Sequence, residues 1–387
     1  MRRRNRRGIA LITALWMLAV LVILVAGFAA AVHSDTQAAG NFAQLTRARW
    51  AARAGLARAE AALISEMAQP YTALQAGRLL LEPAEADGAA AGMTVYRTLV
   101  DDEAGKINLN TASAETLAML LPAEVVDAVL DWRDEDDTPG EQGAESDYYQ
   151  TLTPPYRCRN APFVTVRELL LVKGITRELL ATRVTADGRT LEDLLTVSSS
   201  DTNTDAAGQP RVNLFTASKE ELTEAFSEEL TEEEIDAIIA QRGAAAFRSP
   251  ADLLQMDGLS REKVAAIYDR VTTTTDRVRK GLVNINTAPK AVLMALPDMD
   301  EAAADAIVQR RETTGPYASL GELLDDEGMS VERFRQVAEL LTTRSRVFTV
   351  RSTGQDADGV QATVTCVLGL EQNGSDWTTR TMYWRES

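Results

Sequence analysis

The sequence predicts an α+β fold, in which one long N-terminal helix packs on a small antiparallel sheet and a large all-α insertion interrupts that sheet. Three observations support this prediction. A helical pattern without proline runs to about residue 68, and alternating apolar and polar residues mark strands at 92–103 and after 346. The segment between these strands contains a helical repeat. With 387 residues, 45% of them hydrophobic, the chain is long enough to form more than one core.

The first element is an apolar segment that follows five arginines within residues 1–7. The segment from Gly8 to Val32 carries no charge over 25 residues, and as a helix it would be roughly 36 Å long, enough to cross a bilayer core. Basic residues before the segment, and none directly after it, place the N-terminus in the cytoplasm. We therefore expect a single transmembrane helix over 9–32, with the rest of the chain outside the cytoplasm.

Two processing sites are compatible with this segment. The run Ala29-Ala30-Ala31 has the small residues of a signal-peptide site and would leave Val32 first, although the apolar stretch is long for a secretory signal. The other site is Gly8, which ends a short basic leader over residues 1–8. This second arrangement resembles the leader of type IV pilins and type II secretion pseudopilins. The resemblance implies cleavage between Gly8 and Ile9 by a prepilin peptidase, followed by N-methylation of Ile9.

Most members of that superfamily carry glutamate at the fifth mature position, which in this chain is Thr13. A carboxylate inside a bilayer needs a charged partner, so its absence suggests a subunit that does not dock onto an earlier subunit in the usual way. Beyond the membrane we expect a stem helix over 33–68. Its apolar stripe comprises Phe42, Leu45, Ala52, Leu56, Ala59 and Leu63.

Three stretches between the predicted strands share one pattern. They read INLNTASAETLAMLLP from Ile107, VNLFTASKEELTEAF from Val212 and VNINTAPKAVLMALP from Val283. Each is followed by a second helical segment and then by an apolar segment that ends in a glycine turn. The repeated unit is a small helical bundle. We expect lobe 1 over 106–197, a polar linker over 198–210, lobe 2 over 211–281 and lobe 3 over 282–345.

These repeats resemble the helix-hairpin-helix and SAM-like modules of DNA-binding competence proteins, so a DNA-binding pilin-like protein is an alternative function. In those modules a glycine hairpin offers backbone amides to a phosphate. Here the hairpins lack glycine and contain carboxylates such as Glu124, Glu228 and Asp298, in a chain whose formal net charge is −17. Because DNA binding requires cationic side chains, a protein-interaction bundle fits better, and we expect no nucleic acid partner.

Lobe 1 contains an acidic loop, DWRDEDDTPGEQGAESDYY, from Asp131 to Tyr149. Its carboxylates must be solvated, repel one another or share a cation, and calcium accepts six to eight oxygen ligands in irregular geometry. The spacing is not that of an EF-hand. On this reasoning alone, a solvated loop and a calcium site both remain open.

This loop and its surroundings resemble the minor pseudopilin K family of type II secretion, whose members also typically lack the fifth-position glutamate. The matching segments are Gly105 to Ala112, Asp131 to Asp137, Gly143 to Tyr149 and Pro162 to Ile175. The family usually has two helical lobes, so the middle copy is a departure, and the resemblance is weaker from Val184 to Gly281.

The resemblance implies a calcium cofactor in the helical insertion. The best-matched candidate ligands are Asp131, Asp134, Asp136 and Glu145. A calcium-dependent extracellular adhesin or scaffold is a weaker alternative for the whole chain.

The resemblance also implies a function in protein export. The chain would be a minor pseudopilin of the inner membrane, at the tip of a periplasmic pseudopilus. Its partners would be minor pseudopilins of the I and J types, the major pseudopilin and the prepilin peptidase. Because the chain has one histidine and two cysteines, it has little equipment for acid–base, thiol or zinc chemistry, and we expect no enzyme activity.

The predicted strands complete a pilin-like α/β domain over 90–105 and 346–385. Its expected core and face residues are Met93, Val95, Val347, Thr349, Val364 and Cys366. An oxidising compartment would permit a disulfide between Cys158 and Cys366. The two cysteines lie in different predicted parts, however, and nothing in the sequence brings them together.

Overall fold

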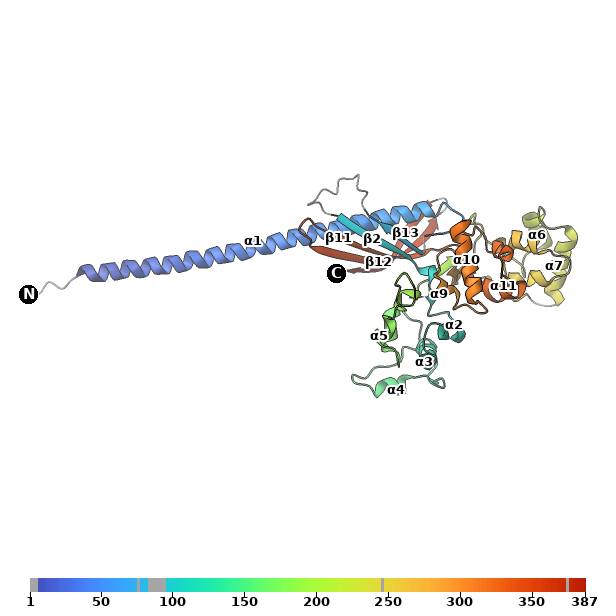
Figure 1. The fold of residues 1–387 in the computed structure, drawn as a ribbon, viewed down its shortest axis with the longest axis horizontal. Coiled ribbons are helices and arrows are strands. Elements are labelled where there is room, and N and C mark those ends of the chain that lie inside the picture. Colours follow the sequence, from blue (N-terminus) through green and yellow to red (C-terminus); the bar gives the residue numbers. More distant parts are fainter. Residues whose placement is uncertain (1–5, 75–76, 83–94, 245–246, 374–375) are drawn as a thin grey trace, which may run out of the picture.

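The computed structural model describes residues 6–74, 77–82, 95–244, 247–373 and 376–387. It consists of a long helix, a five-stranded sheet and three helical lobes, which confirms the expected fold class (Figure 1). Helix α1 (Arg6–Glu66) is one continuous element, and its first half projects away from the rest of the molecule. By length and composition this helix is able to cross a membrane. Most of the leader, residues 1–5, and the expected strand residues 92–94, Met93 among them, lie outside the described residues.

The sheet is antiparallel throughout, in the order β1-β2-β11-β12-β13. The sequence predicted the last four strands in this order along the chain. It did not predict β1, because a run of four residues is too short to show alternation. The strands are β1 (Arg78–Leu81), β2 (Val95–Asp102), β11 (Val347–Gln355), β12 (Gln361–Asn373) and β13 (Asp376–Glu386).

The second half of α1 packs on one face of the sheet. Its buried side chains recur every three or four residues and meet β11 and β12 in one hydrophobic cluster. The buried stripe consists of Ala48, Ala52, Leu56, Ala59 and Leu63. Phe42, which we expected on this stripe, is 68% exposed, because it lies on the N-terminal side of Ala48, where the buried stripe begins.

Two glycines allow α1 to approach the sheet closely. A Cβ on Gly55 would lie 2.3 Å from Thr98 Oγ1 and 2.4 Å from Ser352 Oγ, and these two hydroxyls are hydrogen-bonded at 2.7 Å. A Cβ on Gly354 of β11 would lie 2.0 Å from the carbonyl oxygen of Ala48. At Gly354 the sheet backbone thus meets the helix backbone directly, whereas at Gly55 the helix backbone lies against the Thr98 and Ser352 side chains.

The insertion between β2 and β11 forms the three lobes, each closed by a two-residue parallel strand pair between its first and last residues. Lobe 1 contains β3 (Ile107–Asn108), α2 (Ala114–Ala118), α3 (Ala123–Arg133), α4 (Ser146–Gln150), α5 (Arg177–Leu180) and β4 (Leu195–Thr196). Lobe 2 contains β6 (Val212–Asn213), α6 (Lys219–Phe226), α7 (Glu232–Ala244), α8 (Arg261–Ile267) and β7 (Val271–Thr272). Lobe 3 contains β9 (Val283–Asn284), α9 (Lys290–Leu293), α10 (Glu301–Thr313), α11 (Val331–Val337) and β10 (Leu341–Thr342).

An arginine near the end of the second helix fixes the first corner in every lobe. Arg311 Nη1 donates to the carbonyls of Ile285 and Ala288, at 2.7 and 2.8 Å. Arg133 makes the equivalent pair of bonds in lobe 1, to the carbonyls of Leu109 and Ala112. Arg242 in lobe 2 donates to the Ala217 carbonyl and to that of Phe215, one residue after the equivalent position. The three lobes therefore share this arginine interaction as well as a sequence pattern.

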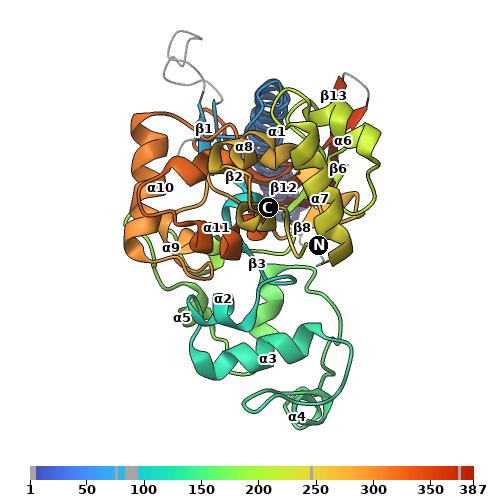
Figure 2. The same ribbon diagram turned by 90° about the vertical axis from the view of Figure 1, so that its right-hand side faces the viewer.

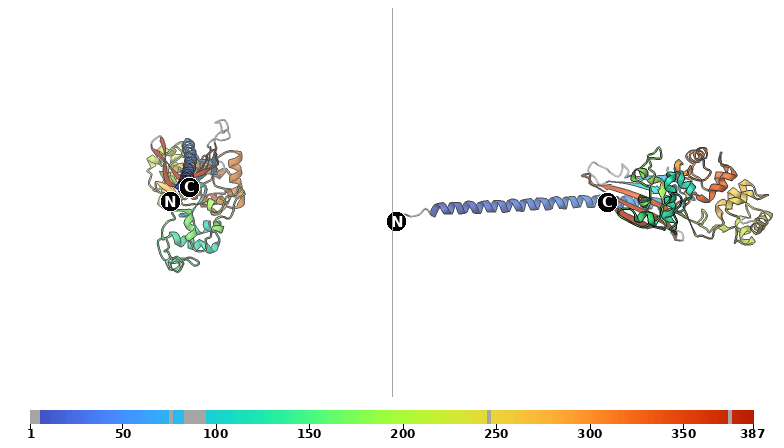
Figure 3. Two further views of the ribbon diagram at one scale, coloured as in Figure 1. Left: turned by 90° about the vertical axis from the view of Figure 1, so that its left-hand side faces the viewer. Right: turned by 90° about the horizontal axis from the view of Figure 1, so that it is seen from below.

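The lobes are not equivalent in position. Lobe 3 lies against the end of the sheet, lobe 2 lies at the end of the molecule farthest from the N-terminus, and lobe 1 projects to one side (Figures 1 and 2). The view from below also shows α1, the sheet, lobe 3 and lobe 2 following one another along the long axis of the molecule (Figure 3). Lobes 1 and 3 share one hydrophobic cluster, to which lobe 2 contributes only Ala251 and Tyr268 among its described buried residues, whereas the rest of the lobe 2 core forms a separate cluster.

The segment 198–210, which we expected as a linker, contains strand β5 (Ser200–Thr202), paired with β8 (Val278–Lys280). Within it the Asp201 side chain is buried and forms ion pairs with Arg344 at 3.4 Å and Arg346 at 3.1 Å. These long-range ion pairs hold the segment to the start of β11. A polar composition therefore did not mean a free linker here.

The helical insertion begins and ends at one buried carboxylate, Asp102, the last residue of β2. It accepts hydrogen bonds from Ser345 Oγ at 2.6 Å, Thr287 Oγ1 at 2.5 Å and the Ala104 amide at 2.8 Å. Burial raises the pKa of Asp102 to about 6, although these bonds oppose the shift. Asp102 thus joins the sheet, the first residues of the insertion, lobe 3 and the return to β11.

We predict that Gly55→Val destabilises the chain by about 1–3 kcal/mol, because the new side chain must displace the helix from Thr98 and Ser352. Chemical unfolding of the full chain in detergent, followed by tryptophan fluorescence, measures this change. Gly40→Val is the matched control in the same helix, since a Cβ there meets nothing within 4 Å. Equal stability of the two variants would contradict close packing at Gly55.

Candidate metal centre

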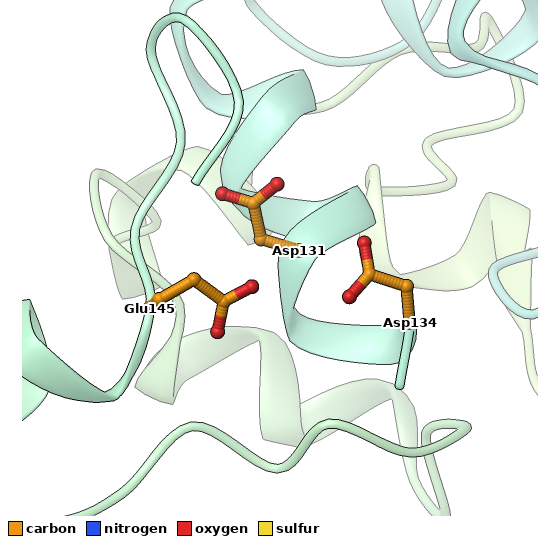
Figure 4. Close-up of side chains that lie close together, drawn as sticks. All are labelled: Asp131, Asp134 and Glu145. Atoms are coloured by element: carbon orange, nitrogen blue, oxygen red, sulfur yellow. The ribbon is translucent and has the colours of Figure 1, made fainter. Parts of the chain in front are cut away.

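Three carboxylates converge where α3 ends and the acidic loop returns toward α4. Asp131 lies in the last turn of α3, Asp134 follows that helix directly, and Glu145 precedes α4. One oxygen from each lies within 4.8 Å of the others (Figure 4). The structure therefore brings together three of the four residues that the sequence suggested as calcium ligands.

Asp131 orders the loop around this cluster. Its carboxylate accepts hydrogen bonds from the Gly140 amide at 3.1 Å and the Ala144 amide at 2.8 Å. A Cβ on Gly143 would lie 1.8 Å from Asp131 Oδ2, so only glycine allows the loop to pass here. Lys173 fixes the same turn from outside by donating to the Gly143 carbonyl at 3.0 Å.

Of the other two carboxylates, Glu145 is buried and Asp134 is half-buried. Within the described part of the chain, no hydrogen-bond partner reaches Asp134 Oδ1 or either oxygen of Glu145, which is only 3% exposed. Burial raises the pKa of Glu145 to about 7; the neighbouring Asp131 and Asp134 add to this shift, and the Cys158 thiol opposes it. Burial raises the pKa of Asp131 and of Asp134 in the same direction.

Unpartnered buried carboxylate oxygens are rare in proteins because their desolvation is not repaid. A hard divalent cation would supply the missing partner, and calcium in particular accepts carboxylate oxygens in irregular arrangements. The donor set of Asp131, Asp134 and Glu145 fits such an ion by charge and by chemistry.

Asp136, the fourth suggested ligand, is exposed and lies outside this group. Its Oδ1 accepts a hydrogen bond from the Thr138 amide at 2.7 Å, and its backbone carbonyl accepts one from Asn160 at 2.6 Å. The side chain therefore stabilises the turn that follows α3. The spacing of acidic residues alone did not distinguish this role from that of a ligand.

A cluster of aromatic rings packs against the acidic loop. Tyr149 is fully buried, stacks on Tyr156 with ring centroids 5.3 Å apart, and meets Trp132 edge-on at 5.2 Å. Its hydroxyl accepts a hydrogen bond from the Lys173 amide at 3.2 Å. Tyr149 lies in α4, which directly follows Glu145. Packing of its ring therefore fixes the start of this helix and, with it, the position of Glu145.

The two cysteines are free thiols, each buried in a different hydrophobic cluster. Burial raises the pKa of Cys158 and of Cys366 to about 12. Cys158 lies beside the metal centre, where its thiol donates to the Asp131 carbonyl at 3.8 Å. The disulfide considered from the sequence is thus absent, because lobe 1 and the sheet keep the two thiols in separate cores.

Comparison with known proteins gives two matches to one family on different lobes. The family described as "Type II secretion system (T2SS), protein K" matches residues 107–183 with one model and residues 212–274 with another. A helix-hairpin-helix motif matches residues 278–342. Lobe 2, where we expected the resemblance to be weaker, is therefore covered by the family, and lobe 3 matches the more general motif.

Curated relatives carry the same description. Type II secretion system protein K of Pseudomonas aeruginosa is 32% identical over 200 residues, covering 44% of this chain and 58% of the relative. The protein of that description in Aeromonas hydrophila is 25% identical over 206 residues, covering 46% of this chain and 62% of the relative. The matched region thus spans less than two thirds of either relative.

A solved structure of similar shape is the GspK-GspI-GspJ complex from enterotoxigenic Escherichia coli, with a TM-score of 0.48 and 12% identity. It covers 91% of this chain and 99% of the matched chain. The matches on lobes 1 and 2 and the similarity to the Pseudomonas protein thus all carry one description, that of the type II secretion system protein K family.

Proposed function

We propose that this chain is a noncatalytic minor pseudopilin, held in the inner membrane by α1 and placed at the tip of a periplasmic pseudopilus that acts in protein export. The observation that carries this proposal is the match of two lobes to the protein K family in a chain whose described residues include one helix long and apolar enough to cross a membrane. The expected partners are minor pseudopilins of the I and J types and the major pseudopilin.

The shape of the molecule supports a position at the tip. Residues 103–345 form lobes that lie beyond the end of the sheet and, in lobe 1, to one side of the α1 axis (Figures 1 and 2). In a filament of parallel stems, the next subunit would have to occupy this space. A subunit with such an insertion therefore fits best where nothing is stacked above it.

The exposed first half of α1 supports a membrane-bound, filament-forming subunit. Large apolar side chains are exposed all around this segment, among them Trp16, Met17, Ile23 and Phe28. In water this surface would be unfavourable, whereas lipid or neighbouring stems would cover it. The arginines of the leader support an orientation with the N-terminus in the cytoplasm and the lobes in the periplasm.

The helix-hairpin-helix match of lobe 3 keeps DNA binding as a second candidate. The hairpin of that lobe contains Asp298 and Asp300, both of which face Arg333. Arg333 beside the hairpin is therefore already paired with carboxylates. This charge distribution favours the pseudopilin function over DNA binding.

We predict that the mature chain begins with N-methylated Ile9. Intact mass and N-terminal sequencing of the protein purified from the membrane of a secreting cell measure this directly. Gly8→Val is expected to leave the leader uncut, whereas the matched substitution Ala31→Val, at the residue before the other possible cut, is expected to leave processing unchanged. A mature chain that begins at Val32 would overturn the assignment to a pseudopilin.

We further propose that Asp131, Asp134 and Glu145 bind calcium and thereby fix the acidic loop. The support is the geometry of the three carboxylates and the three oxygens among them that lack any partner in the described chain. When bound, the ion would offset the repulsion of these carboxylates and tie the end of α3 to the start of α4.

We predict that calcium raises the melting temperature of the full chain, because a ligand that binds only the folded state adds about 2.7 kcal/mol at a hundredfold excess over its Kd. Calorimetry with calcium, with magnesium and with chelator measures the effect. Glu145→Gln is expected to abolish the response to calcium, and Asp136→Asn, the control in the same loop, is expected to retain it. An unchanged melting temperature with calcium would contradict the site.

A second prediction concerns the metal-free chain. Because folding raises the pKa of Glu145 from 4.5 to about 7, the folded state binds the proton more tightly than the unfolded state does. In chelator, this contribution to stability therefore falls as pH rises from 4.5 to 7 and stays low above that.

Unfolding at pH 5 and pH 8 tests this dependence. Relative to the unmodified chain, Glu145→Gln is expected to be more stable at pH 8, by about 1–3 kcal/mol, and similar at pH 5. Glu115→Gln, at an exposed glutamate of the same lobe, is the control. A constant difference between Glu145→Gln and the unmodified chain at both pH values would contradict the assignment.

A further inference from the structure

A groove with a volume of about 360 Å³ lies between lobes 1 and 3. One wall is formed by α2 of lobe 1 and the residue after it, and the other by the segment 294–300, which joins α9 to α10 in lobe 3. It is separate from the metal centre and from the packing of α1 on the sheet. Neither proposed function uses it.

Methionine side chains from both lobes line the groove. Met119 of lobe 1 is 61% exposed, Met294 of lobe 3 is half-buried, and Met299 and Leu296 are buried beneath. A single exposed methionine needs no explanation, but here apolar side chains from distant parts of the sequence meet in one depression. Since the thioether side chain is flexible and polarisable, such a surface adapts to apolar side chains of varied shape.

The rim of the groove is acidic. Glu115 is exposed on the side of lobe 1, and Asp298 and Asp300 are exposed on the side of lobe 3. The one cation in the lining, Arg333, is paired with Asp300 at 2.7 Å and with Asp298 at 3.8 Å. The net charge of the lining is therefore negative, which favours a cationic partner.

Reciprocal contacts at the base of the two lobes hold the walls at a constant separation. A Cβ on Gly281, directly before lobe 3, would lie 1.8 Å from Thr111 Oγ1 of lobe 1. A Cβ on Gly105 before lobe 1 would lie 3.2 Å from Thr287 Oγ1 of lobe 3. The two lobes also share one hydrophobic cluster. The groove is thus formed by a fixed pair of lobes and does not depend on the position of a loop.

We propose that this groove binds a short amphipathic helix of another protein, which inserts two or three apolar side chains between the methionines and places lysine or arginine against the acidic rim. The volume suits a few side chains at the i, i+3 and i+4 positions of one helix face. Charge complementarity selects a basic helix over an acidic one. This inference does not depend on the calcium site or on the position of the chain in a filament.

The test uses the full chain in nanodiscs of zwitterionic lipid with ¹³C-labelled methionine methyl groups. The probes are a 14-residue amphipathic peptide of leucine and lysine, a scrambled peptide of the same composition, and a leucine–glutamate version, with empty nanodiscs as the blank. We expect the leucine–lysine peptide alone to shift the signals of Met119, Met294 and Met299 and to leave that of Met382 on β13 unchanged.

Variants separate the groove from general attraction to an acidic protein. Met119→Lys is expected to weaken binding by at least about tenfold, whereas Met382→Lys adds the same charge at another exposed methionine and is expected to have no effect. Glu115→Lys, which reverses one rim charge, is expected to weaken binding without removing an apolar contact. The unshifted signals of the remaining methionines verify that each variant is folded.

Three results would overturn the proposal. Equal binding of the scrambled peptide would show attraction by charge only. Shifts centred on Met382 would place the site elsewhere, and unchanged affinity of Met119→Lys would show that the methionine wall makes no contact with the peptide.

Discussion

The buried carboxylate of Asp102 is the constraint on which the architecture depends. A sheet strand ends there, an insertion of three lobes follows, and the chain must return to the neighbouring strand β11. Asp102 receives donors from both ends of that insertion and from lobe 3, so the entry and the exit are held at one point. Because the two ends of this long insertion meet at one residue, β2 and β11 pair directly as neighbouring strands. A buried carboxylate with several donors is also specific, since no apolar contact would require the same three segments to meet.

One structural repeat serves different purposes in the three lobes. Lobes 1 and 3 each have a glycine two residues before the first strand and a threonine at the first corner, and each glycine faces the threonine of the other lobe. Lobe 2 has Pro210 and Phe215 where the others have glycine and asparagine, and its core is separate. It is attached to lobe 3 through α8 and α11, with an ion pair of 2.7 Å between Arg335 and Asp252. Lobe 2 thus differs from lobes 1 and 3 at two positions of the repeat. It also differs in its packing, because it contacts lobe 3 through its surface and does not share its main core.

Much of the fold was predictable from the sequence because its signals are local. The stripe from Ala52 to Leu63, the alternation in β11 and β12, and the arginine-preceded apolar helix depend only on residues near one another in the chain. The candidate metal centre was predictable in part, for the same reason. Asp131 and Asp134 follow from their position at the end of α3, but the exclusion of Asp136 and the burial of Glu145 depend on how the loop passes over α3, which Gly143 and the aromatic cluster decide.

The sequence by itself determined the apolar anchor, the stem helix, the strands around an insertion and the three copies of a helical unit, because periodicity and repetition are properties of the chain alone. Only the tertiary structure decided which lobes pair, that the segment 198–210 is held by Asp201, and that the two cysteines stay apart. It also decided that methionines from lobes 1 and 3 line one groove. These outcomes depend on distances between residues far apart in sequence, and such distances follow from the packing of whole elements and leave no pattern in the order of the residues.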